Sequence, residues 1–510
     1  MMNTNTNYNV DVLVCGGGVA GAAAGIAAAR NGMRTLLVEK RESLGGLCTN
    51  GYITGIAGHV DGLCEEWVNR LAQQGKALIR PHLPAVEPES GKVMLEHMVL
   101  ASGCRILYGL HLADCVVNNG RIESVIAYGA GGKVEIKAKV IIDTTGDAIV
   151  ANAAGVPCEI GNAEFMGLNE STSMGFRLSY VNYKKYKEAW EEYKQWLKTR
   201  PIEEHLNYLV YKQNEAIANG DLPFIVAPGA LVYPVVGSNN EECMDVTLDA
   251  THSHYCRNDS VEDLSRQIVD QHRKVLMLVD FMKKYMPGFE NCALTHFAEM
   301  NGTRESRRIV GRYIYTAKDI CNAEKFEDGI AIFPEVLDAH HPTSSKGDAK
   351  RHIHLPEPVP NGVCRPSEDD DDLFMHPFVP MGGYEARPHP RNFAEVPYRA
   401  LVADGVDNLL SAGRCLSADW DAIGAVRVIA TSMTTGQAAG NAAALCVQKG
   451  ITPAELDGKL VREMQKAQGV PLDEPLKGYW ARVRDMEGEV VISKDMAMLR
   501  DKDGNTSFMA

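Results

Sequence analysis

The sequence predicts an α/β fold in which a parallel sheet is built from the first and last thirds of the chain. Residues 11–39 show an apolar strand, a glycine-rich turn, an alanine-rich helix and a second strand that ends at an acid. Residues 140–143 form another apolar strand, followed by a polar turn, and residues 408–413 form a strand that ends in glycine. Strands that alternate with helices are typical of parallel sheets.

The first turn carries the spacing Gly16-x-Gly18-x-x-Gly21, and Glu39 ends the second strand. In this pattern Gly16 allows a tight turn, Gly18 lets the backbone approach a pyrophosphate, and Gly21 lets the helix pack closely on the sheet. The N-terminus of the helix favours negative charge. Glu39 is placed to accept hydrogen bonds from a ribose diol, and it would repel a 2′-phosphate. The segment therefore predicts a Rossmann-like dinucleotide site; the alternative is a glycine turn without a ligand.

Composition narrows the class of protein. The 510 residues are enough for two or more domains, and 45% hydrophobic with 23% charged residues is an ordinary globular composition. The net charge of -14 and the lack of a Lys/Arg cluster argue against binding to nucleic acid or an anionic membrane surface. The 13 cysteines lack paired CxxC spacing. With no signal peptide or membrane span evident, we expect a cytoplasmic protein.

Further elements follow along the chain. Residues 41–62 form a long glycine-rich loop, which is usually a functional feature. Breaks at Asn118-Asn119-Gly120 and at residues 129–132 predict hairpins. Helices are expected at the segments 63–74, 94–101, 181–198, 260–285 and 424–448.

The nucleotide-binding domain is completed late in the chain, so the middle of the chain is an insertion. The residues after about 160 change in character, and the strand and glycine pattern return near residue 408. We predict an N-terminal part at 8–160, a substrate domain at 161–380, a second part of the nucleotide-binding domain at 381–455, and a C-terminal extension at 456–510.

The ordered landmarks resemble the FAD-dependent oxidoreductases of the type with two dinucleotide-binding domains (GR2-type), and specifically the broad bacterial FAD-dependent oxidoreductase group. They comprise the glycine turn with Glu39, Leu44-Gly45-Gly46 with Thr49, Asp61-Gly62, Ile142–Asp147, Arg304–Arg308, Asp338 and His340, Pro397-Tyr398-Arg399, Ala412-Gly413-Arg414 and Gly436–Gly440. The resemblance implies a Rossmann-like FAD-binding domain with an inserted α+β substrate domain. The flavin ring is expected at the boundary between the two.

The resemblance also implies contacts with FAD. Asp147 is expected near the phosphate and ribitol portion, and the main chain near Leu112 and Ala113 at the edge of the adenine. The full set is Gly16, Gly18, Val19, Ala20, Gly21, Glu39, Lys40, Gly45, Gly46, Leu47, Cys48, Thr49, Leu112, Ala113, Thr145, Gly146, Asp147, Gly413, Arg414, Gly424, Val426 and Arg427.

A helix that starts near Gly424 would point its N-terminus at the flavin N1 and C2 carbonyl and stabilise the reduced ring. Arg427 either adds positive charge there or extends toward solvent. Cys48 follows the glycine pair, but Ile53 stands where disulfide reductases carry a second cysteine. Cys48 is therefore a single redox cysteine, a covalent tether or a small apolar filler, and the filler is favoured.

Histidine is the best candidate for proton transfer. His340, with Asp338 nearby, is the first choice, followed by His389 and His59. The chain has 15 histidines, so the alternative for each of these three is a structural role. Arg304, Arg307 and Arg308 are suited to binding a substrate carboxylate. The neighbouring Glu305 also allows ion pairs between domains. The His252, His254, Cys256 spacing lacks a fourth ligand nearby, so no metal is predicted.

These observations predict an enzyme that transfers a hydride between a small organic substrate and non-covalent FAD. Alcohol oxidation and desaturation or reduction next to a carbonyl both stay open. Gly129–Gly132 lacks a following helix, so no second nucleotide fingerprint is present. Oxygen, a quinone, a carrier protein or free nicotinamide would serve the other half-reaction. The alternative is a flavoprotein that uses FAD structurally to bind a partner; the oligomeric state stays open, a homo-oligomer included.

Overall fold

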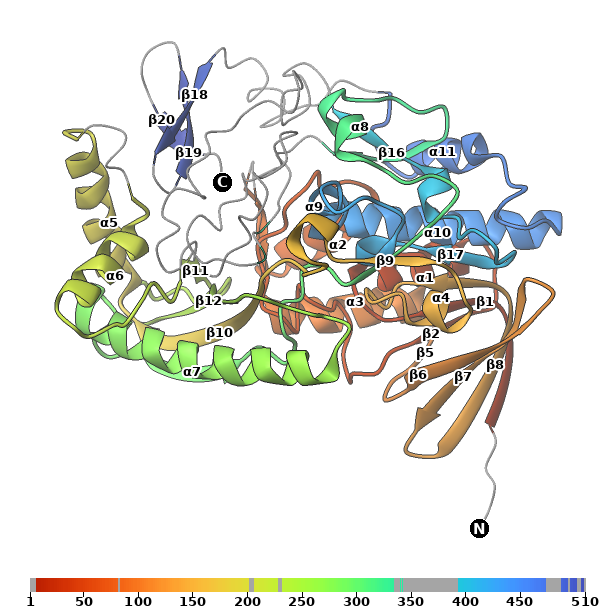
Figure 1. Ribbon diagram of the computed structural model, residues 1–510, viewed down its shortest axis with the longest axis horizontal. Helices are drawn as coiled ribbons and strands as arrows, with labels where there is room; N and C mark the ends of the chain where they lie inside the picture. The colour runs from red at the N-terminus through yellow and green to blue at the C-terminus, as the bar shows by residue number, and fades with distance from the viewer. Residues whose placement is uncertain are drawn as a thin grey trace.

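The computed structural model describes residues 6–80, 83–200, 206–227, 232–333, 340, 342, 393–473, 488–493, 496–501 and 506–508. Its largest element is a mixed sheet of seven strands with the order β5-β2-β1-β8-β7-β6, and β17 pairs with β8 (Figure 1). The bounds are β1 Thr6–Cys15, β2 Thr35–Val38, β5 Arg105–Leu107, β6 His111–Asn118, β7 Arg121–Gly129, β8 Gly132–Asp143 and β17 Leu409–Ser411. The predicted α/β fold class is confirmed.

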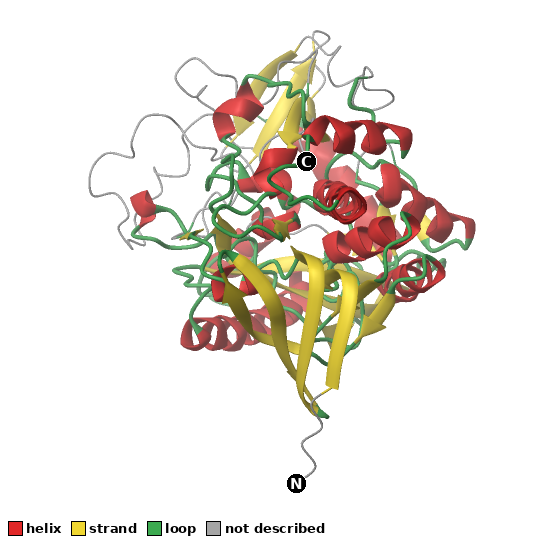
Figure 2. Ribbon diagram, turned by 90° about the vertical axis from the view of Figure 1, so that its right-hand side faces the viewer, coloured by secondary structure: helices red, strands yellow, loops and turns green. Residues whose placement is uncertain are grey.

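The sheet has a parallel part and an antiparallel part. Strands β5, β2, β1, β8 and β17 are parallel to their neighbours, whereas β6, β7 and the start of β8 form an antiparallel meander. The meander lies at the end of the molecule where the N-terminus is marked (Figure 2). Both predicted hairpins are present. Asn119 and Gly120 have φ values of 48° and 75°, as a type I′ turn requires at its two central residues.

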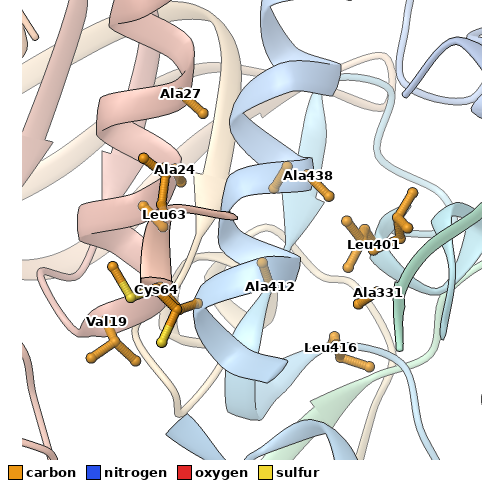
Figure 3. Packing of buried hydrophobic residues seen from close by; sticks show 14 of the residues in the cluster. Val19, Ala24, Ala27, Leu63, Cys64, Ala331, Leu401, Ala412, Leu416 and Ala438 are labelled. Carbon is orange, nitrogen blue, oxygen red and sulfur yellow. The ribbon is translucent and has the colours of Figure 1, made fainter. Parts of the chain in front are cut away.

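Helices α1 (Val19–Arg30), α3 (Pro88–Ala101) and α10 (Ile429–Lys449) pack on this sheet, and α2 (Gly62–Gln73) packs on α3 and α10. Small residues let α1 and α10 approach closely, and Ala24, Ala27 and Ala438 lie on these neighbouring helices (Figure 3). A Cβ atom on Gly440 would overlap the carbonyl oxygen of Ala24. The glycines of α10 therefore set the distance between the two helices.

Replacing Gly440 by alanine is expected to destabilise the protein by about 1–3 kcal/mol, the usual cost of overpacking a core. Alanine has the higher helix propensity, by about 1 kcal/mol, so propensity alone predicts the opposite sign. Urea unfolding measures the difference. Lys449→Ala, at the exposed end of α10, is the control and should change stability by less than about 0.5 kcal/mol.

A second sheet is formed by the middle of the chain. It is antiparallel, with the order β11-β12-β10-β13, and α7 packs against β10 and β12. Ser260 caps α7, as its sequence predicts, by accepting a hydrogen bond from Asp263 N at 3.3 Å. The elements are β10 Thr172–Val181, α5 Tyr183–Leu197, α6 Tyr208–Ala218, β11 Val232–Pro234, β12 Met244–Ser253, α7 Val261–Tyr285 and β13 Ala293–Phe297.

The other elements include four small sheets, of β3 with β4, β9 with β14, β15 with β16, and β18 with β19 and β20. The bounds are β3 Ala77–Leu78, β4 Ala85–Val86, α4 Ile149–Ala153, β9 Cys158–Ile160, β14 Arg307–Ile309, α8 Ala317–Cys321, β15 Gly329–Phe333, β16 Ala394–Pro397, α9 Ile423–Val426, α11 Gly458–Ala467, β18 Gly488–Ser493, β19 Met496–Asp501 and β20 Thr506–Phe508. The prediction of one helix over 424–448 was wrong: α9 ends at Val426, and Val428 caps the separate helix α10. The predicted domain boundary at 380/381 lies outside the described residues. Among the helices of the described ranges, none has both the length and the apolar character needed to span a membrane.

Candidate cofactor and active site

The glycine turn after β1 is held against the end of β8. Gly16 has a φ of 101°, which lies in the left-handed region that favours glycine. Thr144 Oγ1 donates to the carbonyl oxygens of Cys15 and Gly16 at 2.9 and 2.8 Å. A Cβ atom on Gly21 would overlap Gly16 O. The turn and the first residues of α1 therefore pack as closely as the sequence pattern predicts.

The N-terminus of α1 suits a phosphate group. Gly18 is the N-cap and makes no side-chain hydrogen bond, and no acid lies in the first turn. Val19 and Ala20 follow it and are buried. A Cβ atom on Gly18 would meet no atom within 4 Å. The main-chain N–H groups of an uncapped helix start, beside open space, are a site for an anion.

Glu39 lies beside this turn and has both carboxylate oxygens in use. Oε2 accepts a hydrogen bond from Gly17 N at 2.5 Å, and Oε1 accepts one from Arg41 N at 2.8 Å. A carboxylate has about four acceptor positions, so two remain for a ribose diol. The neighbouring Lys40 is exposed. Glu39 thus first fixes the turn, a role that the motif alone did not indicate.

The segment that contacts the main chain of Glu39 comes just before Leu112 and Ala113, the residues predicted at the edge of the adenine. Glu39 N donates to Leu107 O, and Leu110 N donates to Glu39 O, at 2.9 and 3.1 Å. Leu112 and Ala113 follow on the edge strand β6, half-buried and exposed respectively. The turn at 107–110 is therefore the part of the chain that borders Glu39.

The loop after Glu39 turns back onto the glycine turn. Gly45 N donates to Gly17 O at 2.8 Å, and Gly45 and Gly46 have φ values of 100° and 56°. Thr49 Oγ1 donates to Leu44 O at 2.6 Å, and Leu47 is half-buried. The hydroxyl of Thr49 thus closes the loop, so its contribution to a cofactor site is to position Gly45 and Gly46.

Cys48 is fully buried in the apolar core that α1, α2 and α10 share. Burial raises the pKa of its thiol to about 12. The thiolate is the reactive form of cysteine. The structure therefore favours the filler interpretation over a redox cysteine or a covalent tether.

We expect iodoacetamide at pH 8 to leave Cys48 unlabelled in the native protein and to label Cys243, which is exposed. The reason is that alkylation needs an accessible thiolate, and a buried neutral thiol offers none. Peptide mass spectrometry after a short reaction measures both sites, with the unfolded chain as the control for full labelling. Rapid labelling of Cys48 in the native protein would contradict the filler role.

The polar turn after β8 is organised by Asp143, to which the sequence analysis gave no role of its own beyond the Ile142–Asp147 landmark. This buried carboxylate accepts hydrogen bonds from the N–H groups of Thr145, Val150 and Ala151 at 2.9–3.0 Å, and from Thr145 Oγ1 at 2.8 Å. Burial raises the pKa of Asp143, and these donors oppose the rise. Asp143 fixes the segment that leads to Gly146 and Asp147.

Asp147, Gly146 and Arg414, three of the residues predicted to contact FAD, lie next to one another. Arg414 Nη2 donates to Asp147 Oδ1 at 2.8 Å, and its guanidinium lies against Gly146. Ser306 also donates to Asp147 Oδ1, at 2.7 Å. Burial raises the pKa of Asp147, but Arg414, Ser306 and Lys40 together hold that pKa below its ordinary value. Gly413, with a φ of 72°, packs against Ala20 of α1.

The junction between α9 and α10 carries a buried ion pair. Arg427 Nη2 lies 3.1 Å from Glu170 Oε2, with side-chain exposures of 10% and 0%. Arg427 therefore does not extend into solvent. Gly424 and Val426 are buried within α9, before the junction. Among the residues that the structure describes, none hydrogen-bonds to the buried Glu170 Oε1, and the sequence showed no signal for this residue.

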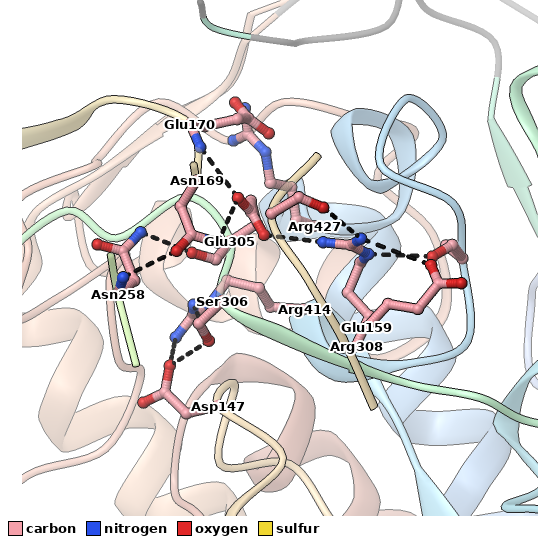
Figure 4. A network of polar contacts seen from close by, with 12 residues as sticks. Asp147, Glu159, Asn169, Glu170, Asn258, Glu305, Ser306, Arg308, Arg414 and Arg427 are labelled. Carbon is pink, nitrogen blue, oxygen red and sulfur yellow. Dashed lines mark hydrogen bonds and ion pairs between the residues drawn. The ribbon is translucent and has the colours of Figure 1, made fainter. Parts of the chain in front are cut away.

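Arg308 has a structural role in place of the predicted catalytic one. It is 1% exposed, and its guanidinium donates to Glu305 Oε2 at 2.8 Å (Figure 4). It also donates to the carbonyl oxygens of Ala418 and Gly161 at 3.1 Å. Three of the five N–H donors of the guanidinium are used in this way, and the side chain is enclosed by the protein, so the structure favours an internal contact over binding of a substrate. The ion-pair alternative from the sequence is the one that fits Arg308.

A group of histidines lies next to the Glu170–Arg427 pair. The main-chain N of His340 donates to Glu170 Oε2 at 2.9 Å, and its ring stacks on His252 with centroids 5.6 Å apart. His252 Nε2 lies 3.0 Å from Arg304 Nη2 and accepts from it, since a guanidinium only donates. Asp338 and His389 lie outside the described residues. Within the described ranges no group of three or more His, Cys, Asp or Glu side chains is arranged to hold a metal ion.

The residues present fit FAD. The uncapped start of α1 and the space beside Gly18 suit a pyrophosphate, and Glu39 suits a ribose diol. The turn at 144–147 lies against the same glycine turn through Thr144. Val428 occupies the N-cap position of α10, and its side chain makes no hydrogen bond to the helix. The N-terminus of this second helix therefore also favours negative charge.

Comparisons with known proteins agree with this geometry. The family model described as FAD dependent oxidoreductase matches residues 11–467. Thiamine thiazole synthase of Methanococcus aeolicus is 30% identical over 159 residues, which cover 28% of this chain and 58% of that protein. The match thus spans little more than half of the curated relative.

Similar solved structures are distant in sequence. A triple mutant of the flavin-dependent brominase Bmp2 is 11% identical with a TM-score of 0.43, covering 90% of this chain and 84% of its own. A geranylgeranyl bacteriochlorophyll reductase-like protein from Thermoplasma acidophilum is 12% identical with a TM-score of 0.39, covering 91% and 82%. These likenesses carry no argument about the reaction. The family model spans most of the sequence, and on that ground the chain belongs to the FAD-dependent oxidoreductase family and is an enzyme whose cofactor is FAD.

Proposed function

We propose that this oxidoreductase transfers a hydride between a small organic substrate and FAD that is held without a covalent bond. When bound, FAD supplies a carrier for two electrons and a hydrogen. The burial of Cys48 supports non-covalent binding, because the thiol that follows the glycine pair is enclosed in apolar core.

The single observation that carries the proposal is the Glu170–Arg427 pair. Glu170 comes just before β10 of the second sheet, and Arg427 just before α10 of the first, and their side chains meet at 3.1 Å. His340, His252 and Arg304 lie around this junction. Positive and proton-carrying groups therefore gather where the start of α10 meets the second sheet, which suits a polar substrate at the boundary between the two parts.

The fitting reactions are alcohol oxidation and desaturation or reduction next to a carbonyl. We propose that oxygen, a quinone, a carrier protein or free nicotinamide serves the second half-reaction. In both reactions the chain binds the substrate, excludes water and exchanges a proton, and the helix start at Val428 stabilises negative charge.

The test is the visible absorption spectrum of the purified protein, before and after acid precipitation. We expect flavin bands that move to the supernatant. Anaerobic mixing with alcohols, 2-hydroxy acids and saturated carbonyl compounds then tests which class bleaches the bands. Bands that stay in the pellet would contradict non-covalent binding, and a colourless protein that fails to take up added FAD would overturn the whole proposal.

A further inference from the structure

His59 and Asp61 form a polar pair in the loop that precedes α2. His59 Nδ1 lies 3.1 Å from Asp61 Oδ2, and the side chains are 16% and 4% exposed. Asp61 Oδ1 accepts a second hydrogen bond, from Thr434 Oγ1 of α10 at 2.8 Å. The carboxylate is thus held by one residue on each side, and its orientation toward His59 is fixed.

Asp61 occupies the N-cap position of α2, yet its side chain does not cap the helix. An acid at this position normally accepts from the first N–H groups of the helix. Here Gln437 Oε1, from α10, accepts from Leu63 N at 2.8 Å in its place. The helix start is therefore served by another residue, and the carboxylate of Asp61 is left for His59 and Thr434.

The same loop packs on the first turn of α10. Ala430 N donates to Ala57 O at 3.0 Å. Gly58, with a φ of 97°, lies so close that a Cβ atom on it would be 3.0–3.2 Å from Ala430, Thr431 and Val428. His59 follows directly. The imidazole is thereby tied to the helix start that, in the proposed function, stabilises the reduced flavin.

The pair also fixes which ring nitrogen of His59 accepts a proton. An ionised carboxylate only accepts, so Asp61 keeps the hydrogen on Nδ1 and leaves Nε2 as the base. Within the described part of the chain, Nε2 has no hydrogen-bond partner. The charged group that contacts His59 there is Asp61, and the residues of α10 that face the loop, Thr434 and Gln437, are uncharged.

We propose that His59 is the residue that exchanges the substrate proton, that Asp61 and Thr434 position it, and that the substrate is a hydroxyl compound or the matching ketone. This rests on the proposed function. In the oxidation direction Nε2 takes the hydroxyl proton as the O–H bond breaks. The C–H hydrogen leaves with its electron pair to oxidised FAD, and a C=O bond forms. The substrate loses two electrons, and FAD gains them.

The test uses the FAD-loaded protein and needs no substrate. Two-electron reduction places negative charge on the flavin, and a histidine beside it takes up a proton in response. Each proton taken up with two electrons changes the equilibrium tenfold per pH unit, which equals about 30 mV. Spectroelectrochemical titration between about pH 6 and pH 8, the range in which histidine titrates, measures the slope of the potential against pH.

We expect a slope near two protons per FAD for the wild-type protein and near one for His59→Asn, with His59→Gln as the second variant. The slope of Asp61→Asn should also fall toward one proton per FAD, because an asparagine amide that donates to Nδ1 of His59 moves the ring hydrogen to Nε2. A purely structural role for Asp61 would leave the slope unchanged. His272→Asn, on the exposed side of α7, is the matched control and should keep the wild-type slope.

The outcomes separate this inference from the proposed function. Equal slopes in the wild-type protein and both His59 variants, with FAD bound and reducible, would overturn the role of His59 and leave the hydride-transfer proposal standing. A slope for His272→Asn as low as that of the His59 variants would also overturn the role of His59, since the effect would not be specific to that residue. A wild-type protein that binds no FAD would instead overturn the proposed function.

Discussion

Replacing Gly18 by alanine is expected to weaken FAD binding about tenfold to a hundredfold while leaving the stability of the FAD-free protein unchanged. Gly18 has φ and ψ of −63° and −179°, which any residue adopts, and a Cβ atom on it would meet nothing within 4 Å. The folded chain therefore accepts the methyl group. That group would fill the space beside the N-terminus of α1 and push the pyrophosphate from its N–H donors, and a hydrogen bond to a charged group contributes about 1.5–3 kcal/mol.

The measurement is a fluorescence titration of the FAD-free protein with FAD, paired with thermal unfolding in the absence of FAD. Gly131→Ala is the matched control, because Gly131 lies in the turn between β7 and β8 and also has open space around its Cβ position. Wild-type affinity in Gly18→Ala would show that the phosphates do not lie at this helix start. A large fall in unfolding temperature would show that Gly18 acts through the fold.

Features that a few neighbouring residues decide could be predicted from the sequence. The glycine turn is one such feature, because the backbone geometry of a single β-α unit requires glycine at positions 16 and 21. The Asn119-Gly120 hairpin turn is another. The cap of α7 at Ser260 follows the same rule, because its partner lies three residues away.

Features that depend on distant partners could not be predicted. Glu170 and Arg427 are 257 positions apart, and Asp147 and Ser306 are 159 apart. Each residue on its own is an ordinary polar side chain, and only the tertiary fold pairs them. The same holds for Gln437, which serves the start of α2 from α10. The sequence could predict the backbone geometry of the glycine turn but not the polar contacts that join the two sheets.

The cluster at 304–308 shows a second limit. Successive residues of a strand point to opposite faces, so a run of arginines does not reveal which one is enclosed. In β14, Arg307 is half-buried and Arg308 is buried against Glu305. The composition of the run suggested a site for a substrate carboxylate, whereas in the structure Arg308 is enclosed and paired with Glu305.

Replacing Arg308 by methionine is expected to cost about 3–5 kcal/mol of unfolding free energy at pH 7, the usual penalty for leaving one partner of a buried ion pair alone. Glu305 is 0% exposed, and besides Arg308 it accepts from Asn169 Nδ2 and Glu170 N at 2.6 and 2.9 Å. Burial raises the pKa of Glu305 above its ordinary 4.5, Arg308 opposes that rise, and Glu170 adds to it. Without Arg308 the pKa of Glu305 rises further.

The sign of the pH dependence follows from this shift. A carboxyl group whose pKa is higher in the folded than in the unfolded state binds its proton more strongly when folded, so stability falls as the pH rises from the unfolded to the folded pKa. The deficit of Arg308→Met should therefore be largest at pH 7 and shrink toward about pH 4, where Glu305 is protonated in both states. Urea unfolding across this range measures the deficit, and Arg307→Met on the same strand should stay within about 0.5 kcal/mol of wild type.

Adding Glu305→Gln to Arg308→Met should recover part of the lost unfolding free energy at pH 7, because removing both charges leaves no unpaired buried ion. A deficit that is independent of pH, or one that the second substitution fails to reduce, would mean that the packing of the Arg308 side chain, and not its charge, stabilises the junction between the two sheets.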